Sequence, residues 1–271
     1  MTAALAEPGF QRLLDLLRGL SSVAVACSGG LDSSLLLAAA RRALGDRVLA
    51  LTVVTPYMAT HEIAEARALT AQLGVRHRVL ELPMPDEIAD NPPDRCYLCK
   101  RALFAELKNV AAEAGCAWLA DGSNRDDLAD YRPGMRALRE LEVRSPLLEA
   151  DLGKAEIRRY ARALNLPVWD KPASACLLTR LPHGTEVRFE LLRRVETAES
   201  ALRALGFSTV RVRCHDDLAR IEVDRAERAR LLDESVGSEV LAVLTRCGFR
   251  YVTLDLQGYR MGSFNAPPSA E

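Results

Sequence analysis

The chain of 271 residues lacks several features that mark special classes of protein. No apolar run approaches the ~18 residues of a membrane-spanning helix. The first twenty residues alternate apolar and charged side chains at helical spacing, without the basic start and continuous apolar run of a signal peptide. A basic surplus is also absent, because 36 Lys and Arg face 37 Asp and Glu. We therefore expect a cytoplasmic protein with no membrane partner, and we do not expect nucleic acid as its ligand.

Cysteine is present, but its pattern does not suit a structural zinc site. The seven cysteines are an odd number, and in a reducing compartment they are more often free, metal-bound or catalytic than paired. The stretch DRCYLCKRA contains Cys96 and Cys99, but no second C-x-x-C and no paired histidines complete a set of four zinc ligands. Four other cysteines are predicted to be small buried residues: Cys27, Cys116, Cys214 and Cys247.

Apolar runs alternate with helical periodicity over the first part of the chain, which predicts a parallel sheet covered by helices. Residues 22–44 are interpreted as a strand, a glycine turn and a helix. Further strands are expected at 47–55, 75–82 and 116–122, and further helices at 61–74, 96–115 and 153–166. Residues 168–187 have little periodicity and are interpreted as a loop near a domain boundary.

The remainder of the chain changes character. A helix at 189–206, a hairpin at 209–224, a helical stretch at 228–248 and a strand at 251–256 indicate a small α+β domain. We therefore predict an α/β domain with a parallel sheet over residues 1–180 and a smaller α+β domain over residues 181–271.

The stretch SGGLDSS, from Ser28 to Ser34, follows the first strand and opens its helix, which is the position of a phosphate-binding loop. Glycines let the backbone approach a ligand, and the N–H groups at a helix start point at an anion. The stretch is not a Walker A loop, because no Lys-Ser/Thr pair ends it, and it lacks the spaced glycines of the dinucleotide fingerprint. Alone, it would also fit a turn that caps a helix.

The pattern resembles the SGGxDS loop of the PP-loop ATP pyrophosphatase superfamily, matched at Ser28, Gly29, Gly30, Asp32 and Ser33. Two further segments are similar to this superfamily in the same order: ADGSNRDD, which contains Gly122, and SPLLEADLGKAEIRRYARALNLP at residues 145–167. The resemblance implies a PP-loop fold that binds ATP at these residues, with Asp32 supporting Mg²⁺. It also implies transfer of AMP to a carboxylate or carbonyl oxygen while pyrophosphate leaves.

A further cysteine, Cys176, lies in the loop KPASACLLTRLPHGT, where the charges of Lys171 and Arg180 would favour its thiolate. The combination of RCYLCK, ACLLTRLPHGT and the PP-loop is similar to the LarE family over nearly the whole chain. Members of this family are ATP-dependent sulfur transferases in the biosynthesis of the nickel-pincer nucleotide, the cofactor of lactate racemase. The resemblance implies adenylation of a carboxylate of pyridinium-3,5-biscarboxylic acid mononucleotide and its conversion to a thiocarboxylate. It also implies a homo-oligomer that acts with other proteins of the nickel-pincer pathway.

Two sulfur sources are implied by the resemblance. In one, Cys176 attacks the acyl-adenylate, gives up its own sulfur by β-elimination and is left as dehydroalanine. In the other, three cysteines hold a [4Fe–4S] cluster whose fourth iron carries a hydrosulfide. Because Cys96 and Cys99 accompany Cys176, we favour the cluster with these three ligands. The alternative for the pair is two thiols one helical turn apart that bind nothing.

Substrate-binding residues are suggested in both domains. Arg211 and Arg213 share one face of the strand TVRVRCH, and in the resemblance this Arg-x-Arg grips the substrate's phosphate. The alternative is a solvated strand face paired with Glu222. Tyr97 could stack on the pyridinium ring or belong to the core. The sequence does not rank four acidic candidates for metal binding or proton removal: Glu196, Glu199, Glu222 and Asp224.

Three other functions remain open from the sequence. A tRNA thiolase of the same superfamily can use a similar set of cysteines, although the near-neutral charge and the lack of an added RNA-binding module count against it. For an ammonia-dependent amide synthetase the cysteines would be irrelevant. A sensor that binds ATP or AMP without catalysis is the third alternative.

Overall fold

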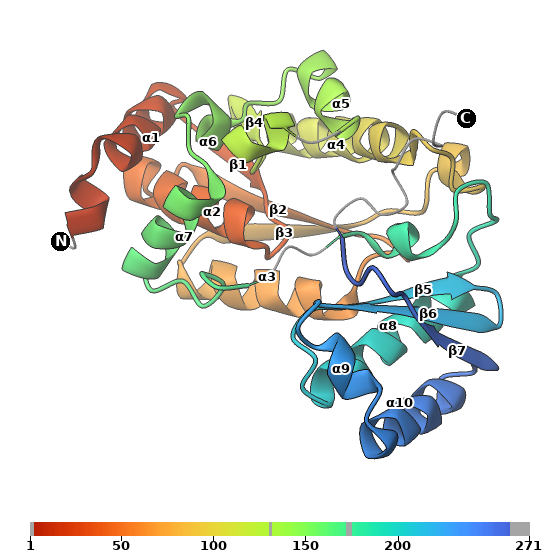
Figure 1. The fold of residues 1–271 in the computed structure, drawn as a ribbon. Helices are drawn as coiled ribbons and strands as arrows, with labels where there is room; N and C mark the ends of the chain where they lie inside the picture. Colours follow the sequence, from red (N-terminus) through yellow and green to blue (C-terminus); the bar gives the residue numbers. More distant parts are fainter. Residues whose placement is uncertain (1–2, 130–131, 172–174, 261–271) are drawn as a thin grey trace. The chain divides into compact units, whose positions relative to one another are not determined.

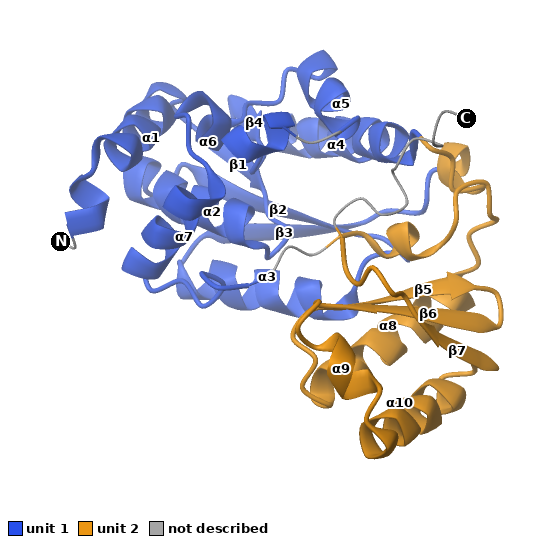
Figure 2. Ribbon diagram, viewed as in Figure 1, with its two compact units in different colours: residues 1–85, 94–174 blue, residues 86–93, 175–271 orange. Residues whose placement is uncertain are grey.

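The structure is a computed structural model that describes residues 3–129, 132–171 and 175–260, in two compact units (Figure 2). The first unit comprises residues 1–85 and 94–174, and the second comprises residues 86–93 and 175–271. Residues 86–93 and 175–180 thus group with the second unit, although they lie before the boundary expected at residue 180. Each unit has its own sheet.

The sheet of the first unit is parallel, in the order β3-β2-β1-β4. Its strands are β1 (Val23–Ala26), β2 (Val48–Val54), β3 (Arg76–Glu81) and β4 (Trp118–Ala120). The chain adds β2 and β3 on one side of β1 and then crosses to add β4 on the other side. This reversal makes a switch point between β1 and β4, where open parallel sheets bind ligands beyond the carboxyl ends of their strands.

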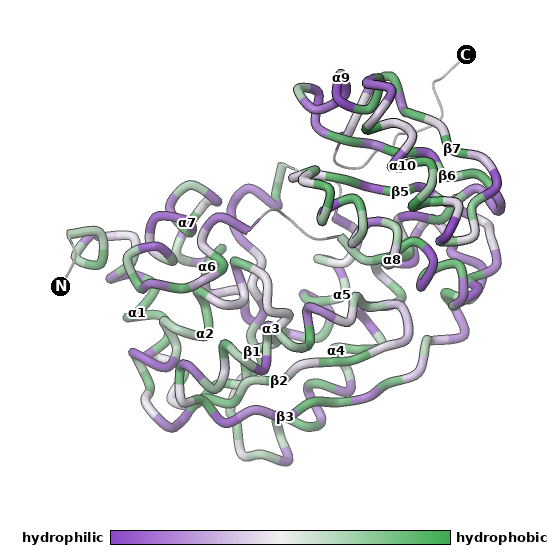
Figure 3. The backbone as a smooth tube through the Cα atoms, turned by 90° about the horizontal axis from the view of Figure 1, so that it is seen from below, coloured by the Kyte–Doolittle hydropathy of each residue, from purple (hydrophilic) through white to green (hydrophobic). Residues whose placement is uncertain are grey.

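Helices cover both faces of this sheet (Figure 1). One apolar cluster joins β1 and β2 to α1 (Pro8–Gly19), α2 (Leu31–Leu44), α3 (Thr60–Gln72) and α7 (Lys154–Ala163), and the cluster on the opposite face joins them to α4 (Arg95–Glu113). The run VLALTVV of β2 is buried along nearly its whole length, as a strand covered on both faces requires, and Figure 3 shows the hydropathy of each residue along the backbone. The shorter helices are η1 (Ala3–Ala6), η3 (Arg125–Ala129), α5 (Gly134–Glu140) and α6 (Pro146–Glu149).

The second unit is a three-stranded sheet with helices. Strands β5 (Val210–His215) and β6 (Leu218–Val223) form the predicted hairpin, and β7 (Tyr251–Leu254) pairs in parallel with β6. Helix α8 packs on β5. The helices of this unit are η2 (Asp86–Ile88), η4 (Leu177–Arg180), α8 (Phe189–Ala204), α9 (Arg228–Leu231) and α10 (Glu234–Arg246). The predicted fold class, a parallel α/β sheet and a smaller α+β unit, is confirmed.

The helical stretch predicted at residues 228–248 contains two helices. Residues 228–248 form α9 and α10 rather than one helix, because the Asp233 carboxylate accepts hydrogen bonds from the N–H groups of Ser235 and Val236 and thereby starts a new helix. None of the helices in the described part of the chain is long and apolar enough to cross a bilayer.

Candidate active site

The SGGLDSS loop joins the carboxyl end of β1 to the start of α2. Gly29 has a φ of +72°, and a Cβ at this position would lie 2.9 Å from the carbonyl oxygen of Glu62. The loop therefore passes so close to α3 that only glycine fits at this backbone angle. This contact explains why the second residue of the pattern is glycine.

Serine side chains brace the loop. The Ser28 N–H donates to Ser33 Oγ at 3.3 Å, and the Ser34 hydroxyl donates to the Gly30 carbonyl at 2.6 Å. Gly30 is the N-cap of α2 and offers no side-chain cap to it. The N–H groups of the first turn can therefore bind an anion such as a phosphate.

The DGSNRDD segment follows β4 and meets the start of α2. A Cβ at Gly122 would lie 2.9 Å from the backbone nitrogen of Ser33. Next to it, the Asp121 carboxylate accepts two hydrogen bonds of 2.6 Å from the hydroxyls of Ser123 and Ser145. The segments that follow β1 and β4 thus come together at the switch point of the sheet.

The two carboxylate oxygens of Asp32 have different surroundings. Oδ2 forms an ion pair with Lys154 at the start of α7, whereas Oδ1 is buried and accepts no hydrogen bond from the described residues. Burial raises the pKa of Asp32, and Lys154 partly offsets this. A buried carboxylate oxygen without a donor suits a hard cation, so Asp32 fits the predicted contact with Mg²⁺.

A second lysine lies at the other side of the loop. Lys171 forms an ion pair with Glu65, and its Nζ lies 3.5 Å from the Gly29 carbonyl oxygen. Arg158 holds this segment by donating to the carbonyls of Trp169 and Lys171, each at 3.0 Å. Lys171 was expected to act on Cys176, but the contacts that the structure gives its amine are with the PP-loop and α3. The SGGxDS pattern alone gives no signal for either lysine.

Cys96 and Cys99 lie near the start of α4, one turn apart on one side of the helix. Cys96 is exposed, whereas Cys99 is partly buried with its Sγ 3.1 Å from Tyr57 Oη, and burial raises the pKa of the Cys99 thiol. Cys176 belongs to the second unit. Within residues 3–129, 132–171 and 175–260, no three His, Cys, Asp or Glu side chains are grouped to hold a metal ion. The ligand set for a [4Fe–4S] cluster stays a prediction.

Tyr97 is buried between α4 and α5. Its hydroxyl donates to Glu140 at 2.8 Å, and the guanidinium carbons of Arg136 and Arg101 lie 3.6 Å and 5.4 Å from the ring centroid. Because two cations already lie close to the ring, this geometry favours a packing role over stacking with a pyridinium.

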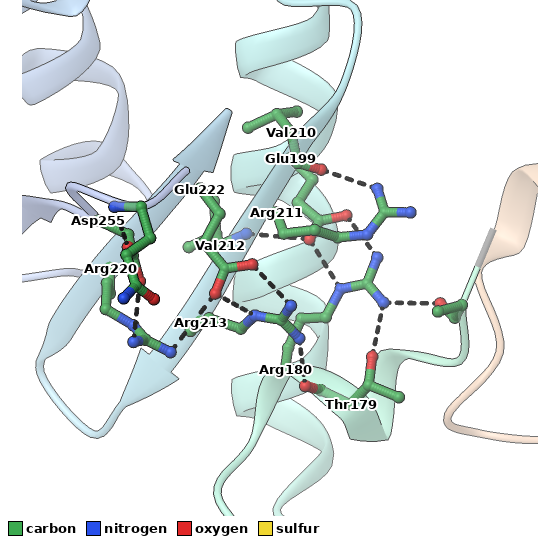
Figure 4. A network of polar contacts seen from close by, with 12 residues as sticks. Thr179, Arg180, Glu199, Val210, Arg211, Val212, Arg213, Arg220, Glu222 and Asp255 are labelled. Atoms are coloured by element: carbon green, nitrogen blue, oxygen red, sulfur yellow. Dashed lines mark hydrogen bonds and ion pairs between the residues drawn. The ribbon is translucent and has the colours of Figure 1, made fainter. Parts of the chain in front are cut away.

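The predicted phosphate grip lies on β5 within a network of charges (Figure 4). Arg213 binds Glu222 with two hydrogen bonds of 2.9 and 2.6 Å and donates to the Thr179 carbonyl at 2.7 Å. Arg211 donates to the Val210 carbonyl at 2.8 Å. Both arginines are buried, so the alternative of a solvated strand face is wrong, although the pairing of Arg213 with Glu222 is present.

Arg211 lies close to other charged side chains of this network. Burial, and then the positive charge of Arg180, lowers the pKa of Arg211. A lowered pKa at a guanidinium indicates a site that a bound anion would stabilise.

Cys176 is the residue directly before η4, and it is exposed. Arg180, expected to act on the thiol by charge, forms a buried ion pair with Glu199. Burial lowers the pKa of Arg180, but Glu199 and then the charge of Cys176 raise it above its ordinary value, so an electrostatic interaction with Cys176 accompanies the ion pair. Glu199 and Glu222 thus have arginine partners. The other two acidic candidates have partners near the surface: Glu196 pairs with Arg193 at 2.7 Å, and Asp224 accepts the Ala226 N–H at 2.9 Å.

A parallel sheet whose switch point carries an SGGxDS loop, an uncapped helix start and a close glycine segment defines a PP-loop enzyme that uses ATP. In agreement, the sequence profile of the asparagine synthase family matches residues 15–112. The chain is 40% identical over 256 residues to the pyridinium-3,5-bisthiocarboxylic acid mononucleotide synthase of Lactiplantibacillus plantarum, which covers 93% of this chain and 92% of that protein.

Two other relatives are informative. An uncharacterized protein of Synechocystis sp., slr1717, is 39% identical over 262 residues, 96% of this chain and 97% of that protein. A tRNA-specific 2-thiouridylase of Beijerinckia indica is 27% identical over 77% of the chain and 62% of that protein. The chain belongs to the LarE family of PP-loop enzymes, which confirms the resemblance found in its motifs and rules out the alternative of a non-catalytic sensor.

Proposed function

We propose that this enzyme adenylates a carboxylate of pyridinium-3,5-biscarboxylic acid mononucleotide with ATP and converts it to a thiocarboxylate. The observation that carries the proposal is the contact of Gly122 with the uncapped start of α2, beside the buried Asp32 Oδ1. This arrangement suits a triphosphate and its metal ion. The choice of substrate rests on the similarity to the synthase of Lactiplantibacillus plantarum over 93% of the chain.

In the adenylation step, the N–H groups of α2, Lys154 and Lys171 hold the β- and γ-phosphates. Mg²⁺ on Asp32 would screen the charge of the leaving pyrophosphate. A carboxylate oxygen of the substrate attacks the α-phosphorus, and pyrophosphate leaves with the electron pair of the broken P–O bond. In the resulting acyl-adenylate, AMP can leave the carbonyl carbon much more readily than an oxide ion could leave the free carboxylate.

The sulfur has two candidate sources. If Cys176 supplies it, the thiolate attacks the carbonyl carbon and AMP leaves with the electrons of the C–O bond. A base then removes the Cα proton of Cys176, the Cβ–S bond breaks, and the thiocarboxylate departs from a dehydroalanine. A [4Fe–4S] cluster on Cys96, Cys99 and Cys176 would supply sulfur without consuming the chain. The one-turn spacing of Cys96 and Cys99 supports the cluster, which we favour.

In the second unit, Arg211 and Arg213 bind the phosphate of the nucleotide substrate. The lowered pKa of Arg211 supports this role. Burial removes the water that would stabilise its positive charge, and a bound anion can stabilise that charge instead. The family resemblance further supports a homo-oligomer that delivers its product to other proteins of the nickel-pincer pathway.

The test uses protein prepared without oxygen and incubated with ATP, Mg²⁺ and the biscarboxylic mononucleotide. We expect pyrophosphate release that requires the mononucleotide, and a thiocarboxylate product identified by mass spectrometry. Pyrophosphate release with tRNA or ammonia in place of the mononucleotide would instead support the thiolase or the amide synthetase.

The sulfur source is tested by iron and acid-labile sulfide analysis with a Cys176→Ser variant. About four iron and four sulfide per chain, lost in the variant, would support the cluster. A protein without iron whose Cys176 peptide loses the elements of H₂S after one turnover would identify Cys176 as the donor.

A further inference from the structure

Arg180 holds the backbone of the loop that carries Cys176. One nitrogen, Nη1, donates to the carbonyl oxygens of Ala175 at 2.7 Å and Cys176 at 3.1 Å, and to the Thr179 hydroxyl at 2.8 Å. The Arg180 side chain is only 3% exposed, whereas Cys176 is exposed. A buried cation therefore holds the backbone of the two exposed residues Ala175 and Cys176.

The other side of the guanidinium is anchored in the sheet and helix of the second unit (Figure 4). Nε and Nη2 donate to the two oxygens of Glu199 at 2.8 and 3.0 Å. Glu199 lies on α8, and its Oε1 also accepts the N–H of Val212 on β5 at 3.0 Å. One Arg–Glu pair thus joins the Cys176 loop, α8 and β5.

The pair stays charged although it is buried. Burial alone would lower the pKa of Arg180, but Glu199 raises it above its ordinary value. Burial would likewise raise the pKa of Glu199, but Arg180 lowers it. The anchor therefore keeps its full hydrogen bonding across the pH range in which enzymes work.

The peptide of Cys176 is fixed more firmly than the start of a short 3-10 helix requires. Its carbonyl oxygen accepts from the Thr179 N–H at 3.0 Å and the Thr179 hydroxyl at 2.7 Å as well as from Arg180. A fixed peptide sets the direction of the Cα–Cβ bond and leaves the thiol only its staggered χ1 positions.

We infer that Arg180 is a positioning residue for sulfur transfer, which holds Cys176 so that its thiol meets the activated carboxylate, or a cluster, in one orientation. The inference rests on the proposed function. The inference explains why residue 180 is an arginine. Only a planar guanidinium group can donate to a carboxylate on one side and to two carbonyl oxygens on the other. Lysine would keep the charge but could not make this set of bonds.

The experiment compares Arg180→Lys with wild type at saturating ATP and mononucleotide. Because a displacement of about 1 Å in a reacting group costs on the order of 100-fold, we expect thiocarboxylate formation to fall by about that factor. Pyrophosphate release and the KM for ATP should change by less than about 3-fold, since the nucleotide site lies in the first unit. Arg193→Lys is the matched control, because Arg193 forms a more exposed pair with Glu196 on α8, the helix that also carries Glu199. It should leave pyrophosphate release and thiocarboxylate formation unchanged.

A parallel loss of pyrophosphate release and thiocarboxylate formation, or no loss of either, would overturn the inference. If Arg180→Lys does not fold, Glu199→Gln gives the same comparison, because glutamine can still accept the Val212 N–H while its hold on Arg180 is weakened.

Hydrogen exchange provides a readout that needs no substrate, and so separates this inference from the proposed function. The Thr179 and Leu181 amides, bonded to Cys176 and Leu178, should exchange at least about 10-fold faster in Arg180→Lys, while amides of α8 keep their protection. Unchanged exchange at these two amides would refute the positioning role whichever substrate the enzyme uses. A wild-type enzyme that forms no thiocarboxylate would instead refute the proposed function.

Discussion

Lys154 forms an ion pair with Asp32 across 122 residues of chain and thereby joins the start of α7 to the first turn of α2. The pair occupies one carboxylate oxygen and leaves the buried Oδ1 to face another ligand. Two sequence segments that resemble the PP-loop superfamily separately are thus parts of one site.

Replacement of Asp32 by Asn tests whether this oxygen serves a metal ion. Loss of the charge should lower pyrophosphate release by about 100-fold or more, because a metal ion contributes several kcal/mol to such a step. Burial raises the pKa of Asp32, so protons compete with Mg²⁺ for it, and the Mg²⁺ concentration for half-maximal wild-type activity should rise as the pH falls. Asp15→Asn, in an exposed pair with Arg18, is the control. Full activity of Asp32→Asn would contradict the assignment.

Gly122→Ala should weaken ATP binding through a steric clash. The new methyl group would lie 2.9 Å from the Ser33 nitrogen and would push apart the two segments that meet at the switch point. We expect the KM for ATP to rise at least about 10-fold and the free energy of unfolding to fall by about 1–3 kcal/mol. Gly19→Ala is the control, because nothing lies within 4 Å of its Cβ, and a helical alanine should stabilise the protein by about 0.5–1 kcal/mol. Unaltered ATP kinetics in Gly122→Ala would show that the contact is not part of the site.

Substitution of Arg211 should mainly weaken substrate binding, whereas substitution of Arg213 should mainly destabilise the fold. Arg211→Met should raise the KM for the mononucleotide at least about 10-fold and should lower the melting temperature less than Arg213→Met does, because burial already disfavours the charge that it removes. Arg213→Met should lower the free energy of unfolding by about 3–5 kcal/mol, because it leaves the carboxylate of Glu222 buried without its bidentate partner. Adding Glu222→Gln to Arg213→Met should restore part of this loss. Equal effects of the two single variants would contradict the division of roles.

His77 should make stability depend on pH. The Thr52 hydroxyl donates its only proton to the carbonyl of Cys27, the residue directly before the PP-loop. His77 Nε2–H must therefore donate to Thr52 Oγ1, at 2.8 Å. The other ring nitrogen of His77, Nδ1, lies 3.0 Å from the Thr70 hydroxyl. Burial, with the charge of Arg67, lowers the pKa of His77 below its ordinary value of 6.5.

The unfolded chain therefore binds a proton before the folded chain does. The contribution of His77 is complete above about pH 6.5 and is lost as the pH falls through the lower folded pKa. Urea unfolding between about pH 8 and pH 5 should show this loss in wild type and in the exposed-site control His61→Gln, but not in His77→Gln. Identical pH profiles for wild type and His77→Gln would exclude His77 as the source of the loss of stability at low pH.

Much of the fold could be read from local patterns. The apolar run of β2, the glycine turn after β1 and the alternation along β5 predict their elements because each depends on residues adjacent in the chain. The break between α9 and α10 was missed because the apolar spacing continues through it, although Asp233 is a capping residue.

The sequence by itself determined the phosphate loop, the α/β class and the family, since these rest on the spacing of glycines, serines and apolar residues over short stretches. Only the tertiary structure decided the partner of each charged side chain. Lys154 pairs with Asp32, Lys171 with Glu65, and Arg180 with Glu199. The physical reason is that an ion pair requires its atoms within about 4 Å, and such proximity between distant segments is set by the packing of the whole unit.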